Sequence, residues 1–269
     1  MSRARPPQSR VTLSEEDGVR FLHFGTEWVQ GAMRIARPWR LELEYQRRMM
    51  ATALLAPAPR EVLQLGLGAA GLTRFCLRHL PRARVTVVER DPAVVRVAHR
   101  WFRLPAPGER LRIVEGDAGA HVAAATESAD WLQVDLYDAR ARGPVLDGEA
   151  FYRDCRAALR PGGAAAFNLF RGSLGASLGR IDGAFGGRWM SLPATPEGNC
   201  IVVAAAPGGP LPARATLHAR ARRMESALGL AATAWLEGAR LAWLPVGADL
   251  AFRSGSNAPK RRNSGLLPS

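Results

Sequence analysis

Four carboxylates stand where they could bind a cation or take up a proton. Glu89, Asp117 and Asp135 each end or closely follow a short apolar run, and Asp138 comes three residues after Asp135. A carboxylate next to an ammonium group binds it and can accept its proton. Because the carboxyl ends of parallel strands meet at one edge of a sheet, we expect all four side chains to converge on one crevice.

A glycine loop precedes these acids. Gly66, Gly68 and Gly71 form a G-x-G-x-x-G pattern after one apolar run, and Glu89 follows Gly66 by 23 residues. Glycines let a nucleotide approach the backbone, and an acid at the next strand end accepts hydrogen bonds from ribose hydroxyls. The pattern therefore predicts a site for an adenosine-bearing molecule.

The other acids narrow the choice of nucleotide. Asp117 suits the amino group of adenine, whereas a pyrophosphate would be repelled by it, which disfavours a nicotinamide-linked dehydrogenase. Four carboxylates suit a cationic ligand. S-adenosylmethionine and its decarboxylated form are sulfonium cations, so these two molecules fit the pattern.

The elements that must position these residues alternate along the chain. Apolar runs rich in β-branched residues predict strands, and the longer stretches between them predict helices. The expected strands are 61–65, 84–89, 111–115, 129–134 and 164–169, and the expected helices are 71–80, 92–102, 118–125 and 148–159. This order predicts an α/β fold with a parallel, doubly wound sheet.

Shorter elements flank this core. Before it we expect a β-hairpin with strands at 19–23 and 28–35, and a helix over 41–55. After it we expect an edge hairpin with strands at 189–193 and 200–206, followed by helices over 213–228 and 230–244.

The formal net charge of +13 suggests an anionic partner until the charges are located. Basic side chains without any acid occupy the two ends of the chain and supply seven of the thirteen charges: Arg3, Arg5, Arg10, Arg253, Lys260, Arg261 and Arg262. Both ends are rich in Pro, Ser or Gly, which predicts disordered tails. Solvated tails explain the excess better than a nucleic-acid surface, although binding of nucleic acid through the tails stays open.

Several functional classes find no support. The sequence shows no apolar run long enough to span a membrane and no signal peptide, so we expect a cytoplasmic protein without a membrane partner. The three cysteines, Cys76, Cys155 and Cys200, are far apart, and the five histidines lack metal-ligand spacing. We therefore expect neither disulfides nor a metal.

Several segments together resemble the spermidine synthase (polyamine aminopropyltransferase) family, over roughly residues 27–206. The likeness rests on the glycine loop and on these segments: Val29-Gln30, Glu44-Tyr45-Gln46, Val88-Glu89-Arg90-Asp91, Glu115-Gly116-Asp117, the D-x-x-D of Asp135 to Asp138, Phe151-Tyr152 and Pro196-Glu197-Gly198. The resemblance implies a Rossmann-like, methyltransferase-type doubly wound sheet preceded by a small N-terminal β-hairpin region, usually in a homodimer.

Composition, the predicted elements and this resemblance together divide the chain into five expected segments. They are a disordered basic tail over 1–17, the hairpin region and helix over 18–55, the Rossmann-like catalytic domain over 56–206, a C-terminal helical extension over 207–252 and a disordered basic tail over 253–269.

The resemblance also implies roles for single residues. Asp135 matches the catalytic base, and Tyr45 and Asp138 match the residues that bind the attacking amine. The implied cofactor-binding positions are Gln30, Gln46, Gly66, Gly68, Gly71, Glu89, Asp117 and Ala118. The implied reaction is transfer of an aminopropyl group from decarboxylated S-adenosylmethionine to a polyamine, a small cationic amine, without a metal.

Three departures keep other functions open. Family members usually carry an Asp in the glycine loop, where this chain has Ala69-Ala70. They usually have a Pro at the position of Ala139 and a Tyr at the position of Thr195. The loop acid grips the aminopropyl end of the cofactor, and its loss removes a charge that would repel the carboxylate of intact S-adenosylmethionine. A methyltransferase of unknown substrate is therefore one alternative, and a non-catalytic nucleotide-binding homologue is another.

Overall fold

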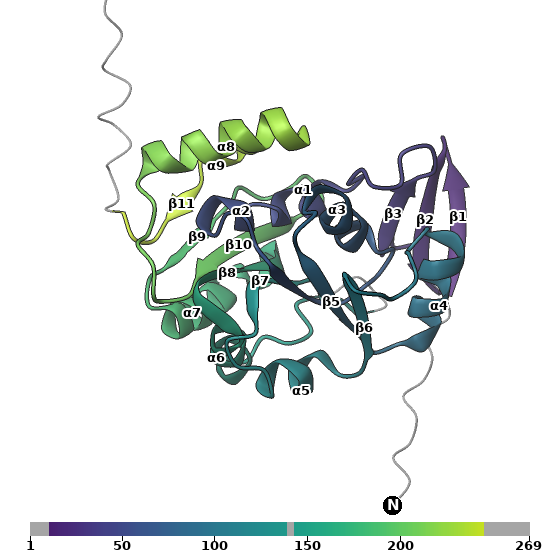
Figure 1. The fold of residues 1–269 in the computed structure, drawn as a ribbon, viewed down its shortest axis with the longest axis horizontal. Coiled ribbons are helices and arrows are strands. Elements are labelled where there is room, and N and C mark those ends of the chain that lie inside the picture. The colour runs from purple at the N-terminus through teal and green to yellow at the C-terminus, as the bar shows by residue number, and fades with distance from the viewer. Residues whose placement is uncertain (1–10, 139–142, 245–269) are drawn as a thin grey trace, which may run out of the picture.

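The computed structural model describes residues 11–138 and 143–244. Two sheets organise this part of the chain (Figure 1). A three-stranded antiparallel sheet has the order β1-β2-β3, and an eight-stranded, mostly parallel sheet has the order β11-β9-β10-β8-β7-β4-β5-β6. The predicted fold class, a doubly wound sheet preceded by a small N-terminal β region, is confirmed.

The elements before the glycine loop form the small sheet and two short helices. They are β1 (Val11–Glu16), β2 (Val19–Phe24), β3 (Gly31–Arg34), α1 (Glu44–Met49) and α2 (Thr52–Leu55). The prediction of a tail over 1–17 is wrong for residues 11–16, because this segment pairs with β2 through a tight turn at Asp17-Gly18. Both turn residues have positive φ, 49° and 72°, as two-residue hairpin turns require. Residues 1–10 lie outside the described chain.

The doubly wound core follows the predicted boundaries closely, except that β8 begins at Leu159, whereas the strand was predicted over 164–169. Its elements are β4 (Glu61–Leu65), α3 (Gly71–His79), β5 (Arg84–Glu89), α4 (Pro92–Trp101), β6 (Leu111–Glu115), α5 (Ala118–Ala123), β7 (Ala129–Val134), α6 (Glu149–Ala158) and β8 (Leu159–Phe170). Strands β6, β5, β4, β7 and β8 run parallel and adjacent in that order. The chain therefore reverses its direction of winding between β4 and β7.

The remaining elements extend the sheet beyond β8. They are a 3-10 turn η1 (Arg171–Ser173), α7 (Leu174–Phe185), β9 (Trp189–Ser191), β10 (Asn199–Ala205), α8 (Arg214–Leu228), α9 (Ala232–Leu236) and β11 (Arg240–Leu241). The predicted antiparallel hairpin at 189–193 and 200–206 is present as β9 and β10.

Two predicted helices are shorter than expected. The helix predicted over 41–55 is broken into α1 and α2 at the buried Met50-Ala51 pair. The helix predicted over 230–244 contains only α9, because Gly238 adopts a positive φ of 77° and turns the chain into β11, which pairs with β9. The predicted tail over 253–269 lies outside the described residues.

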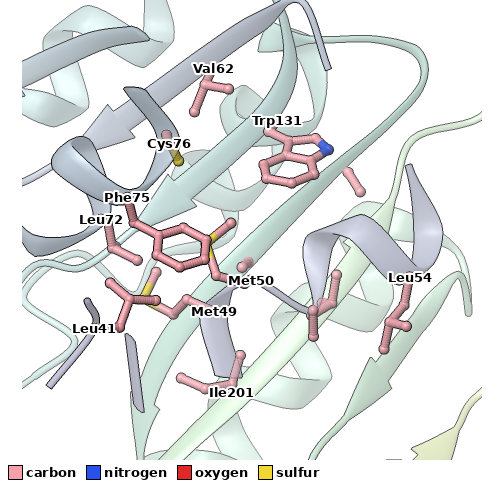
Figure 2. Packing of buried hydrophobic residues seen from close by; sticks show 14 of the residues in the cluster. Leu41, Met49, Met50, Leu54, Val62, Leu72, Phe75, Cys76, Trp131 and Ile201 are labelled. Atoms are coloured by element: carbon pink, nitrogen blue, oxygen red, sulfur yellow. The ribbon is translucent and has the colours of Figure 1, made fainter. Parts of the chain in front are cut away.

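Helices cover both faces of the large sheet (Figure 1). Side chains alternate along β10, so that Ile201 and Val203 face the helices α1, α2, α3 and α8, while Val202 and Ala204 face α6 and α7. Figure 2 shows the first of these layers, where Met49, Met50 and Leu72 surround Phe75. This alternation buries both faces of the sheet and leaves its carboxyl edge free to form a site.

Candidate active site

A large cavity opens at the carboxyl ends of β4 and β7, where the winding of the sheet reverses. Its volume is about 1340 Å³. Single ligand pockets usually measure roughly 300–1000 Å³, so this cavity has room for two substrates side by side. The crevice predicted from the strand-end acids is therefore present.

The glycine loop forms the wall of this cavity next to β4. Gly66 has a φ of 94°, and a Cβ atom at this position would lie 2.3 Å from the carbonyl oxygen of Asp135. A Cβ at Gly68 would lie 3.3 Å from the carbonyl oxygen of Gln30. Glycines at 66 and 68 therefore bring the loop against both neighbouring segments and expose its backbone to the cavity.

The middle of the loop faces away from the cavity. The side chain of Ala69 is only 1% exposed and packs with Leu22 and Met33 of the small sheet. The buried Arg74 guanidinium holds this turn by donating hydrogen bonds to the carbonyl oxygens of Ala69 (2.5 Å) and Phe102 (2.7 Å). The loop is thus fixed from behind, and it places no carboxylate of its own in the site.

Glu89 closes the end of β5 beside this loop. Its carboxylate accepts hydrogen bonds from the backbone N–H groups of Leu67 (3.0 Å) and Asp91 (2.9 Å). Burial raises the pKa of Glu89, and these backbone donors oppose that rise by stabilising the charged form. Glu89 is therefore already oriented along the cavity wall, as binding of ribose hydroxyls requires.

Asp117 and Ala118 line the same wall after β6. One carboxylate oxygen of Asp117 caps α5 by accepting a hydrogen bond from the backbone N–H of Ala120 (2.9 Å). Asp117 is solvent-exposed, whereas Ala118 is buried. Capping fixes the position of the Asp117 side chain at the cavity edge.

Asp135 lies at the centre of the cavity floor, directly after β7. Its carboxylate accepts hydrogen bonds from the side-chain amide of Asn168 (2.9 Å) and from the Tyr45 hydroxyl. Burial raises the pKa of Asp135, and both hydrogen bonds act in the opposite direction. The pKa of Tyr45 is raised by burial and by the nearby Asp135 charge, which keeps its hydroxyl protonated as a donor. The predicted base and the predicted amine-positioning tyrosine are thus in contact.

A polar network that the sequence did not predict supports Asp135. The buried Asn168 accepts hydrogen bonds at its side-chain oxygen from the Asn199 amide (3.0 Å) and from the Tyr137 hydroxyl (3.3 Å). Asn168 is the buried polar residue of strand β8, and Asn199 begins β10. The network therefore anchors Asp135 to the two strands beyond β7.

Asp138 and Gln30 meet across the cavity entrance. The Gln30 side-chain amide donates a hydrogen bond to the Asp138 carbonyl oxygen (3.1 Å), and both residues line the cavity. This contact joins the small sheet to the segment after β7.

Two predicted binding residues lie behind the cavity wall. Gln46 is buried and, like Gly71, is not among the lining residues. A Cβ at Gly71 would lie 2.7 Å from the Gln46 side-chain oxygen, and that oxygen has no hydrogen-bond partner within the described chain. The Gln46 amide is 3.4 Å from the Tyr45 hydroxyl, so Gln46 contacts the site through Tyr45.

The cavity lining is strongly acidic although the chain is basic. The lining contains only two basic side chains, Arg47 and Arg90, among the described residues. Nine carboxylates line it: Glu27, Glu42, Glu44, Glu89, Asp91, Asp117, Asp135, Asp138 and Glu197. Glu42 and Glu44 are paired with arginines, and the other carboxylates leave the described lining net acidic, which favours a cation.

The described residues contain neither a membrane-spanning helix nor a metal-binding group of side chains. No helix there is long and apolar enough to cross a membrane. No group of three or more His, Cys, Asp or Glu side chains there could hold a metal ion, and the three cysteines are free and buried.

Comparison with known proteins places this geometry in context. Residues 42–167 match the family model described as a spermine/spermidine synthase domain. The chain is 35% identical to a polyamine aminopropyltransferase of Chromobacterium violaceum over 82% of this chain and 85% of the relative.

Solved structures share the fold. A probable spermidine synthase from Corynebacterium glutamicum superposes with a TM-score of 0.70 at 21% identity, covering 96% of this chain and 95% of the other. Human methyltransferase-like protein 13, solved in complex with SAH, superposes with a TM-score of 0.62 at 22% identity, covering 70% and 93%.

Proposed function

The chain belongs to the spermine/spermidine synthase family of polyamine aminopropyltransferases, and from this premise we propose that it transfers the aminopropyl group of decarboxylated S-adenosylmethionine to an amine. The family assignment confirms the resemblance seen in the sequence and makes the protein a transferase. The observation that best supports the proposed reaction is the acidic cavity with Asp135 on its floor, beside the glycine turn at Gly66.

The nucleoside half of the donor fits the wall made by β4, β5 and β6. The backbone of Gly66 and Gly68 would lie against the thioribosyl group, and Glu89 would accept hydrogen bonds from the ribose hydroxyls. Asp117 and Ala118 would contact the adenine. Gln30 would bind the donor from the small sheet, and Gln46 would act from behind Tyr45.

The acceptor amine needs a base before it can react. Alkylamines have a pKa of about 10, so the amine arrives as an ammonium ion at neutral pH. The Asp135 carboxylate binds this ion and takes one proton, which frees the nitrogen lone pair. Tyr45 and Asp138 hold the amine in line with the carbon to be attacked.

The displacement itself needs orientation more than activation. The amine nitrogen attacks the propyl carbon bonded to the sulfonium sulfur, a C–N bond forms, and the C–S bond breaks with its electron pair going to sulfur. The products are methylthioadenosine, the aminopropylated amine and one proton, which leaves through Asp135. Because the sulfonium is already a good leaving group, positioning of the two reactants contributes most of the acceleration.

One observation favours a second candidate, a methyltransferase using intact S-adenosylmethionine. Position 69 of the glycine loop carries an alanine that faces away from the cavity, so the loop does not repel a carboxylate on the donor. The chain also shares its fold with a human methyltransferase-like protein solved with SAH.

A product analysis distinguishes the candidates. The purified chain is incubated with either donor and a panel of amines, and the products are analysed by mass spectrometry. Methylthioadenosine together with an aminopropylated amine supports the proposal, and S-adenosylhomocysteine with a methylated product supports the second candidate. Donor binding without either product identifies a non-catalytic homologue. Homodimer formation and cytoplasmic location stay predictions.

A further inference from the structure

Exposed apolar side chains gather at the mouth of the acidic cavity. Six large hydrophobic side chains are exposed in the described chain, and four of them line this cavity. These four, which we call the apolar rim, are Trp28 (55% exposed), Val29 (42%), Val145 (52%) and Phe170 (43%). Scattered exposed hydrophobic residues are ordinary, whereas their concentration around one cavity marks a binding surface.

The backbone holds the rim in place from three separate segments. The Trp28 carbonyl oxygen contacts the His23 ring nitrogen at 3.2 Å, and the Val145 N–H donates to the Leu136 carbonyl oxygen at 3.2 Å. Phe170 ends β8 and lies against Gly198, where a Cβ would come within 3.0 Å of its ring. These contacts make the rim a formed surface.

The two exposed tryptophans outside the cavity are each covered by arginine side chains. Trp39 stacks with Arg78, and Trp101 stacks with Arg20 and Arg100. Within the described residues, Trp28 has no such cation–π partner. Its ring is therefore available to a ligand.

We propose that the acceptor is an amine attached to an aromatic or bulky apolar group, which the rim covers while the carboxylates below bind the ammonium. This proposal rests on the proposed aminopropyl transfer and specifies its substrate. A short linear diamine beside the donor would leave much of the cavity of about 1340 Å³ unfilled and the rim in water. An aromatic body matches the apolar mouth, and its amine matches the acidic floor.

Two diamine acceptors test this. 1,4-Diaminobutane and 1,4-bis(aminomethyl)benzene both carry two primary amines, but only the second has a ring. Binding is measured by calorimetry with methylthioadenosine present, and kcat/KM by release of methylthioadenosine from decarboxylated S-adenosylmethionine. We expect the aromatic diamine to bind about tenfold more tightly and to react with about tenfold higher kcat/KM, the scale on which small apolar contacts discriminate substrates.

Variants identify the rim as the cause. Trp28→Ala and Phe170→Ala should each remove most of the preference for the aromatic diamine, so that the ratio of its kcat/KM to that of 1,4-diaminobutane falls from about ten toward one. Trp39→Ala, which removes an exposed tryptophan outside the cavity, should leave the preference unchanged.

The two proposals fail differently. Tight binding of the aromatic diamine without any transfer would contradict the reaction and leave the binding preference intact. Equal or tighter binding of 1,4-diaminobutane, or an unchanged preference in both rim variants, would overturn the apolar acceptor. Transfer to lysine side chains of a peptide in preference to both diamines would overturn it as well.

Discussion

Replacing the carboxylate of Asp135 by an amide should abolish most turnover without unfolding the protein. In Asp135→Asn the amide oxygen can still accept the 2.9 Å hydrogen bond from Asn168, so the floor of the cavity keeps its shape. The amide cannot accept a proton. General-base catalysis contributes about 10²–10⁴-fold, which corresponds to about 2.7–5.4 kcal/mol at 1.36 kcal/mol per tenfold.

The assay follows methylthioadenosine release at saturating donor and amine. We expect kcat to fall by about 10²–10⁴-fold, while the calorimetric affinity for methylthioadenosine changes by less than about twofold, because the proposed nucleoside contacts are with Gly66 and Glu89. Asp154→Asn is a matched control, since Asp154 lies on α6 and does not line the cavity. Its kcat should stay at the wild-type value.

The pH profile supplies an independent readout. Burial raises the pKa of Asp135, and the base must be unprotonated to work, so wild-type activity should fall as the pH drops through this raised pKa. The acidic limb should disappear in Asp135→Asn. A variant that keeps more than about a tenth of wild-type kcat, or that keeps the same acidic limb, would show that another group takes the proton.

Two further predictions concern the support of the site. Asn168→Ala removes a hydrogen bond that lowers the pKa of Asp135, so the acidic limb of the kcat profile should move to higher pH; an unmoved limb would contradict this support. Gly66→Ala should destabilise the fold by more than about 3 kcal/mol in chemical denaturation, because its Cβ would meet the Asp135 carbonyl oxygen and its φ is positive. Gly179→Ala, in an open helical position, should instead stabilise by about 0.5–1 kcal/mol.

The core of the fold was predictable because each strand is bounded by strong local patterns. Strands β4, β5, β6 and β7 have the predicted boundaries. Each is a short, mostly apolar run between helical stretches; β4 and β7 are buried on both faces, whereas β6 at the sheet edge is only partly buried. Such runs leave little choice of secondary structure.

Elements outside this core depended on weaker patterns. Helix α7 was not predicted, because Gly175, Gly179 and Gly183 lower its helix propensity; the buried face formed by Ile181 and Phe185 compensates for them by packing against the sheet. Strand β1 was assigned to a tail, although the Asp17-Gly18 pair between two alternating segments is a strong hairpin pattern.

The candidate site shows the same limit of sequence reasoning. The positions of the strand ends in the sequence are enough to predict that Glu89, Asp117 and Asp135 lie at one edge of the sheet. Asn168 could have been found as the one polar residue in the predicted strand 164–169, but its hydrogen bond to Asp135 depends on the order of β7 and β8. That Gln46 lies behind Tyr45 depends on how α1 packs, which no local pattern specifies.

Net charge and local charge lead to opposite conclusions about the ligand. A chain of +13 should repel a polyamine at long range, yet nine of its 24 acidic residues line one cavity whose lining, among the described residues, holds only two arginines. Exposed charges on the outer surface of a protein are screened within about 8 Å at physiological ionic strength, whereas carboxylates around a partly enclosed cavity are screened less. A cation at the cavity therefore interacts more strongly with the nearby carboxylates than with the distant basic side chains. The positions of the charges in the fold, more than the net charge, determine which ligand binds.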